Sequence, residues 1–253
     1  MIIYIMDQSL HRIIYEQEQN HWWYAGRRLI IFDFIRRMIP EKAKRALDIG
    51  CGSGLNAMIL SAYASEIVGI EISDDAIAAA KKTAPNLTII KGSWPTVPLT
   101  GLFDVIICLD VLEHIQDDGA ALHTIESLLA PNGIALLTMP ALPSLWTDHD
   151  AIAHHYRRYT KNMLLRLIEK HTNLEIARIS YFNSFLFLPI VFFRALKKIL
   201  PLRAGASDIF ALPAPLNSAL RSLFGAERFI LRYGNFPIGV SLVCVVRKKP
   251  AAR

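Results

Sequence analysis

The stretch Leu47-Asp48-Ile49-Gly50-Cys51-Gly52-Ser53-Gly54 joins an apolar segment to a helical pattern through a turn with three glycines. Glycine permits a tight turn and lets the backbone approach a ligand closely. In open α/β sheets, ligands bind beyond the carboxyl ends of the parallel strands. The stretch therefore predicts a strand, a ligand-binding turn and a helix at one edge of such a sheet.

The residues around the glycines narrow the kind of ligand. Leu55 occupies the position of the third glycine in the dinucleotide fingerprint Gly-x-Gly-x-x-Gly, so that fingerprint fails. Asp48 precedes the first glycine, and its carboxylate would repel a pyrophosphate on the helix N-terminus. S-adenosylmethionine (SAM) fits better, because it carries an ammonium and a sulfonium and has no phosphate.

A second acidic residue, Glu71, ends the apolar pattern Val68-Gly69-Ile70 on the next expected strand. A carboxylate at this place can accept hydrogen bonds from both hydroxyls of a ribose. The glycine turn and Glu71, in this order and at this spacing, favour a cofactor site over a purely structural turn.

Strand and helix patterns alternate along the middle of the chain. The expected strands are 46–49, 66–70, 88–91, 103–109, 133–139, 174–181 and 240–247, and the expected helices are 55–64, 75–83, 119–129 and 161–171. Such alternation implies right-handed crossovers and a parallel sheet covered by helices on both faces.

The remaining segments frame this core. A helical pattern from about residue 8 to residue 39 predicts one or two helices, and Pro40 ends the run. We interpret residues 1–253 as a single domain, with a helical lid at 1–40, a core at 44–181 and 239–248, and a hydrophobic and basic insertion at 182–238.

Bulk composition limits the partners. Hydrophobic residues make up 53%, the mean hydropathy is +0.30 and the net charge is +6. These values indicate a buried parallel sheet or a membrane surface, and they favour an anionic partner. Lys and Arg are spread along the chain and form no basic stripe, so we do not expect nucleic acid as the partner.

Cysteine usage and the N-terminus bear on location. Cys51, Cys108 and Cys244 have no CxxC spacing, which favours a reduced, cytoplasmic protein. The apolar start is too short for an export signal, so we expect no export. Peripheral attachment to the inner face of the membrane is kept as an alternative, and the oligomeric state stays open.

Taken together, these motifs resemble the class I SAM-dependent methyltransferases, specifically the small-molecule group similar to ubiquinone-biosynthesis enzymes. The resemblance covers roughly residues 22–181 and the final strand, and rests on the segments 47–54, 68–71, 103–115 and 129–133. It implies an α/β, Rossmann-like, seven-stranded and mostly parallel sheet with an antiparallel last strand. It also implies N-terminal lid helices and a helical insertion before that strand.

The resemblance also implies cofactor contacts. The glycine turn would hold the methionine half of SAM, Glu71 the ribose and Ile72 one face of the adenine. Tyr24 and Arg27 of the lid would close over SAM and meet its carboxylate, unless this aromatic stripe only packs on the sheet edge. The expected cofactor-binding residues are Asp48, Gly50, Cys51, Gly52, Gly54, Glu71, Ile72, Ser93, Trp94, Leu109, Asp110, Tyr24 and Arg27.

The segment after the fifth strand, residues 146–160, is rich in groups that bind and move protons. We expect His155 to be the catalytic base, with His154 and Asp148 as further candidates. A base is needed only if the acceptor is a hydroxyl or a similar acid, and the alternative is a solvated loop. The expected acceptor-binding residues are Arg157, Arg158, Tyr159 and Trp146.

No metal site is expected. Glu113 and His114 are adjacent, and neighbouring residues of an α-helix point about 100° apart, so the two cannot readily share one ion.

Residues 185–200 are apolar first and basic at their end, with Arg194, Lys197 and Lys198. This composition is typical of a segment in an anionic membrane interface, and a lid over an apolar acceptor or a dimer contact are alternatives.

We therefore expect transfer of a methyl group from SAM to a small-molecule or lipid-like acceptor at oxygen, with carbon and nitrogen left open. The alternative from a different class is a catalytically silent, membrane-associated scaffold that binds SAM.

Overall fold

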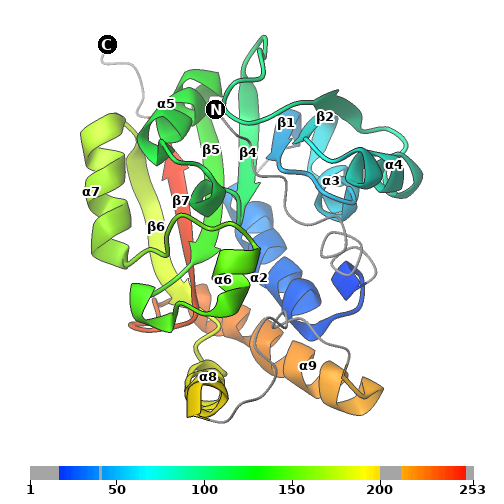
Figure 1. Cartoon of the computed structure of the whole chain (residues 1–253). Coiled ribbons are helices and arrows are strands. Elements are labelled where there is room, and N and C mark those ends of the chain that lie inside the picture. Colours follow the sequence, from blue (N-terminus) through cyan, green and yellow to red (C-terminus); the bar gives the residue numbers. More distant parts are fainter. Residues whose placement is uncertain (1–16, 40–41, 200–211, 249–253) are drawn as a thin grey trace.

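The structure, a computed structural model, describes residues 17–39, 42–199 and 212–248 (Figure 1). Part of the helical pattern expected near the N-terminus lies outside these residues. The elements are α2 (Trp22–Met38), β1 (Ala43–Ile49), α3 (Leu55–Leu60), β2 (Ala64–Glu71), α4 (Asp74–Thr83), β3 (Thr88–Lys91), β4 (Phe103–Leu109), η1 (Leu112–His114), α5 (Asp118–Leu128), β5 (Leu129–Pro140), η2 (Pro143–Leu145), α6 (Asp148–Ile152), α7 (Lys161–His171), β6 (Glu175–Phe182), α8 (Phe187–Ile199), α9 (Ala214–Leu231) and β7 (Ser241–Arg247).

All seven strands form one sheet in the order β3-β2-β1-β4-β5-β7-β6. Strands β1 to β5 pair in parallel, and β7 runs antiparallel to both β5 and β6. The predicted Rossmann-like sheet with an antiparallel last strand is therefore confirmed. Because the order reverses direction between β1 and β4, a crevice opens beside their carboxyl ends, where such sheets bind ligands.

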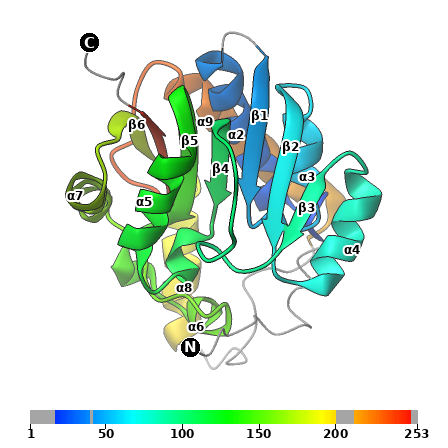
Figure 2. The same cartoon turned by 90° about the horizontal axis from the view of Figure 1, so that it is seen from above.

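Helices cover both faces of the sheet (Figure 2). One apolar cluster joins the sheet to α5 and α7 through residues such as Leu122 and Leu164. A second cluster joins the opposite face to α2, α3 and α9 through residues such as Ile31 and Phe224. The central strands are buried from both sides, which accounts for their nearly continuous apolar sequences.

Helix α9 packs directly on α2. A Cβ at Gly26 would lie 2.6 Å from Cδ1 of Phe224, so only glycine permits this approach of the two helices. Arg232 at the end of α9 donates to Asp33 of α2 at 2.6 Å. Part of the expected insertion at 182–238 thus belongs to a helical layer of the core, whereas α8 lies at the lower edge of Figure 1.

Two element boundaries differ from the sequence prediction. Helix α3 ends at Leu60 and not at residue 64, because Ala64 already pairs with Ala43 in the sheet. Strand β5 begins at Leu129 and not at residue 133, and a shift in its register with β4 accommodates the turn residues in between.

Among the described helices, none combines the length and the apolar character that crossing a membrane requires.

Candidate active site

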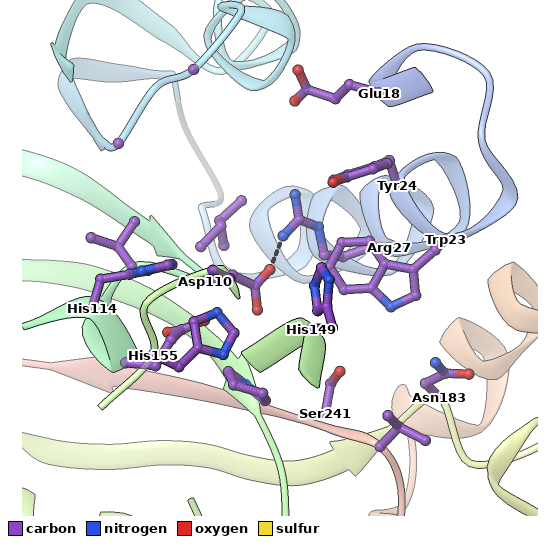
Figure 3. A pocket seen from close by; sticks show the side chains of 18 of the residues that line it. Glu18, Trp23, Tyr24, Arg27, Asp110, His114, His149, His155, Asn183 and Ser241 are labelled. Carbon is purple, nitrogen blue, oxygen red and sulfur yellow. Dashed lines mark hydrogen bonds and ion pairs between the residues drawn. The ribbon is translucent and has the colours of Figure 1, made fainter. Parts of the chain in front are cut away.

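A cavity of about 630 Å³ lies at the carboxyl ends of β1, β2 and β4. Helix α2 and the segment around α8 supply its other walls, so residues far apart in the sequence meet there. Figure 3 shows side chains from α2, from the loop after β4 and from the loop around α6 around one space. The cavity occupies the place where parallel α/β sheets bind their ligands.

The glycine turn forms the floor of one end of this cavity. The amides of Gly50 and Cys51 donate to the carbonyl oxygen of Ile70 at 2.9 and 3.0 Å, which folds the turn over β2. Gly50 has φ +70°, and a Cβ there would lie 2.7 Å from Cγ2 of Val111. Glycine is required at this position both for its backbone conformation and for space.

The Glu71 carboxylate is fixed beside the turn by backbone amides. Oε2 accepts from Gly52 at 3.0 Å, and Oε1 accepts from Ile72 and Ser73 at 2.8 and 2.9 Å. The side chain is therefore oriented at the cavity edge before any ligand arrives, at the place expected for a ribose contact.

Negative charge accumulates near this end of the cavity. Asp48 is 1% exposed, and its Oδ2 has no hydrogen-bond partner in the part of the chain that the structure describes. Burial, together with the nearby Glu18 and Glu71, raises the pKa of Asp48 well above its ordinary value. A positively charged ligand would pair with the ionised Asp48 carboxylate, so the residues here fit the ammonium group of SAM.

Arg27 of α2 and Asp110 after β4 form an ion pair within the cavity (Figure 3). The guanidinium also stacks over the ring of Trp23, with 4.7 Å from Cζ to the ring centroid. This pair ties the first helix to the loop after β4. Nε of Arg27 is buried and has no partner among the residues described, which leaves one donor for a ligand group.

Most of the expected cofactor-binding residues line the cavity: Gly50, Cys51, Gly52, Glu71, Ile72, Ser93, Trp94, Leu109, Asp110, Tyr24 and Arg27. Two do not. Asp48 lies just behind the turn, and Gly54 begins α3, where a Cβ would lie 3.1 Å from Cα of Ala80. The place of Asp48 indicates an electrostatic role, and the place of Gly54 indicates that it allows the turn to pack closely.

His155 lines the cavity and is held by a buried carboxylate, Asp150. Although burial opposes ionisation, hydrogen bonds from His155 and Arg158 lower the pKa of Asp150 well below its ordinary value. Arg158 donates through Nε to Asp150 at 2.8 Å and through Nη1 to the carbonyl of Ala141 at 3.0 Å. Arg158, expected to bind the acceptor, thus borders the cavity with its guanidinium engaged by the protein.

Several other expected residues lie away from the cavity. Asp148, His154 and Trp146 are on the exposed side of the loop around α6. Arg157 pairs with Asp118 at 2.8 Å, and the hydroxyl of Tyr159 donates to the same carboxylate at 2.9 Å. Of the residues proposed from this loop, the fold brings His155 and Arg158 to the cavity.

The structure also brings Glu113, His114 and His155 together. Their potential ligand atoms all lie within 4.8 Å of one another. Glu113 and His114 lie in the short 3-10 turn η1, and the ends of their side chains approach each other and His155 even though adjacent residues of the turn point in different directions, so the sequence argument against a shared ion does not hold. Burial raises the pKa of Glu113 to about 8, so this carboxyl holds a proton at neutral pH.

Sequence reasoning singled out neither Asp150 nor Glu18, and it considered Glu113 only as a metal ligand. Asp150 carried a local signal, because it forms a capping box with Thr147 at the start of α6. Glu18 reaches the glycine turn by accepting from Ser53, a contact across 35 residues that no local pattern reveals.

Comparison with known proteins agrees with this geometry. Residues 22–183 match the family described as a methyltransferase domain. The mitochondrial ubiquinone biosynthesis O-methyltransferase of Schizosaccharomyces pombe is 30% identical over 141 residues, which are 49% of this chain and 52% of the relative. The ubiquinone biosynthesis O-methyltransferase of Albidiferax ferrireducens is 28% identical over 40% of this chain and 43% of its own length. The chain thus spans about half of these curated relatives.

Among solved structures, the N-methyltransferase NodS of Bradyrhizobium japonicum, in complex with S-adenosyl-L-homocysteine, superposes with a TM-score of 0.57. The two chains are 14% identical, and the match covers 96% of this chain and 97% of that one. This likeness shows the fold. Because the family match spans residues 22–183 and the cavity has the features of a SAM site, the chain belongs to the class I SAM-dependent methyltransferases.

Proposed function

We propose that the chain methylates a hydroxyl oxygen of an apolar, lipid-like acceptor, with His155 as the general base. The observation that carries this proposal is the contact between His155 and Asp150. Transfer to a hydroxyl requires removal of a proton, and an imidazole held by a buried carboxylate is suited to take it.

The proton arrangement of the pair supports this role. The ionised carboxylate of Asp150 can only accept hydrogen bonds, so Nδ1 of His155 carries the proton that joins them. The other ring nitrogen, Nε2, then keeps a lone pair. The ring of His155 borders the cavity, so that lone pair can receive a proton from an acceptor bound there.

The acceptor half of the cavity favours an apolar molecule. Leu186, Pro189, Ile190 and Phe193, from the segment around α8, line it together with Leu220 of α9. Such walls bind a ring or an alkyl chain by removing apolar surface from water.

The residues divide the work of the reaction. Glu18 and Glu71 lie where the cationic cofactor would bind, and Asp48 adds a negative charge there once it loses its proton, while the ion pair of Arg27 and Asp110 forms part of the cavity wall. Bound SAM supplies a methyl group whose S–C bond breaks as the acceptor oxygen forms the new O–C bond, while the sulfur keeps the electron pair. His155 takes the proton of the hydroxyl. The remaining catalysis comes from holding the oxygen close and in line.

The exposed side of α8 fits a membrane surface as the source of such an acceptor. Leu188 and Phe192 are 75% and 70% exposed, and Lys197 and Lys198 follow them in the sequence. Apolar side chains followed by basic residues are the composition of a helix lying in an anionic interface. Because Pro189 and Ile190 of this helix also line the cavity, an acceptor in the interface would lie near its entrance.

The test is a methyl-transfer assay with labelled SAM and two matched acceptors, 4-hexylphenol and 4-hexylaniline. We expect label in the methyl ether of the phenol and little in the aniline. Transfer to the aniline at the same or a higher rate would contradict the assignment to oxygen.

A further inference from the structure

The end of the cavity farthest from the glycine turn is built by the closing strands of the sheet. Strand β6 is the edge strand opposite β3, and β7 lies between it and β5. The residues of this end are Asn183, Leu186, Pro189, Ile190, Phe193, Leu220, Val240 and Ser241. Most of them are apolar, so polar atoms among them are conspicuous. Figure 3 shows Asn183 and Ser241 among the side chains that line the cavity.

Asn183 is the unusual member of this set. The residue is 1% exposed, yet neither Oδ1 nor Nδ2 has a hydrogen-bond partner within the described ranges. A buried carboxamide without partners costs free energy, and such groups in folded proteins are commonly completed by water or by a ligand. Because the residue lines the cavity, the carboxamide lies next to the space that a ligand would occupy.

The loop that carries Asn183 is fixed by a second buried residue. Oε1 of Glu227, from α9, accepts hydrogen bonds from the backbone amides of Ser184 and Phe185 at 2.7 and 2.8 Å. Close packing adds to this, since a Cβ at Gly239 would lie 2.4 Å from the carbonyl oxygen of Phe182. The backbone that carries Asn183 is therefore held in place without a ligand, as a recognition site requires.

The backbone conformation at position 183 explains in part, but not fully, why asparagine occupies it. Asn183 has φ +57°, a left-handed conformation that glycine and asparagine adopt most readily. Asn132 has a similar φ of +65° and is exposed to solvent. Glycine would satisfy the backbone at position 183 and bury no polar atoms, so the carboxamide itself calls for a partner.

We propose that Asn183 binds a second, neutral oxygen group of the methyl acceptor, such as a hydroxyl, away from the oxygen that is methylated. This inference rests on the proposed function. A carboxamide both donates and accepts hydrogen bonds, and a hydroxyl can do the same in return. A carboxylate could pair only with Nδ2 and would leave Oδ1 without a partner. The subsite therefore selects for a neutral acceptor with two oxygens on an apolar skeleton.

The test compares two probes that differ by one hydroxyl, 4-hexylresorcinol and 4-hexylphenol. Binding of each is measured by calorimetry with the protein saturated by S-adenosylhomocysteine. We expect the wild type to bind the resorcinol about tenfold more tightly, equivalent to about 1.4 kcal/mol, and Asn183→Gly to bind both equally. Asn132→Gly, which changes the same residue type at a similar φ, keeps the tenfold preference.

The proposed subsite is wrong if Asn183→Gly prefers 4-hexylresorcinol as strongly as the wild type does. It is also wrong if the wild type binds the two probes equally or binds neither of them. Thermal melting shows whether each variant is folded. Methyl transfer to 4-hexylphenol is measured in parallel. Its absence, together with a preference that depends on Asn183, refutes the proposed O-methylation and leaves the subsite in place.

Discussion

Nδ1 of His155 lies 2.9 Å from Oδ1 of Asp150, whose side chain has no exposed surface. The backbone amide of Thr147 donates to the other oxygen, Oδ2, at 2.8 Å, so both oxygens of the carboxylate are engaged. This pairing fixes the orientation and the tautomer of an imidazole that borders the cavity. Through this pair, the loop around α6, which has no regular sequence pattern, contributes a candidate base to the site.

Replacement of His155 by alanine should slow turnover by about 100-fold, because a positioned base contributes about 10²–10⁴-fold to proton transfer. Binding of SAM, measured by calorimetry, should stay within about twofold, since the ring borders the acceptor half of the cavity. His154→Ala is the matched control, because this neighbouring histidine is exposed and lies outside the cavity. Equal turnover of the two variants would remove His155 from the mechanism.

Asp48→Asn should weaken SAM binding by about tenfold or more, because asparagine cannot become negatively charged when the cationic cofactor binds. The raised pKa of Asp48 predicts how the affinity for SAM changes with pH. Below that pKa the carboxyl is protonated and must lose its proton before it can pair with a cation, so the affinity of the wild type falls as the pH falls. The variant should lose this pH dependence.

The same substitution should raise the melting temperature of the free protein at pH 8. An acid whose pKa is raised by folding destabilises the folded state at every pH above its pKa in the unfolded chain, because folding then requires the group to take up a proton or to bury its charge. Asp148→Asn changes an exposed carboxylate outside the cavity and should leave both affinity and melting unchanged. A pH-independent affinity in the wild type would contradict the role of Asp48.

Removal of divalent ions should leave turnover unchanged. Glu113, His114 and His155 come close enough to share an ion, but the raised pKa of Glu113 keeps this carboxyl neutral near pH 7 and makes it a poor ligand. Activity is compared after dialysis against EDTA and after addition of Mg²⁺, Mn²⁺ or Zn²⁺. Loss of activity on chelation and its recovery with one ion would identify a metal site and displace His155 as the base.

The wild type should float with vesicles that contain phosphatidylglycerol, and a variant with Leu188→Ser and Phe192→Ser should not. The two substitutions remove the most exposed apolar side chains of α8, which are expected to enter the interface. Leu102→Ser is the control, because Leu102 is 46% exposed but precedes β4, at the opposite end of the sheet. Equal flotation of all three proteins would contradict attachment through α8.

The cofactor end of the site was predictable because its residues lie at strand ends. Gly50 and Glu71 each follow an apolar strand, and parallel strands bring their carboxyl ends to one edge of the sheet. The position of each residue at the end of an apolar strand was therefore enough to predict that they lie close together. His155 was predicted on similar grounds, as a histidine beyond the end of β5, but its partner was not, because the two acidic residues of α6 look alike in the sequence.

By itself, the sequence determined the order of strands and helices and the glycine turn that lines the cavity, and it predicted a cationic ligand there. These depend on periodicity and on residues close in the chain. Only the tertiary structure decided that Asp150 and not Asp148 faces His155 and that Glu18 reaches the turn. The same holds for the burial of Asn183 beside the cavity, with no hydrogen-bond partner in the described part of the chain. Each of these depends on packing between elements far apart in sequence, and burial and charge are settled only when those elements meet.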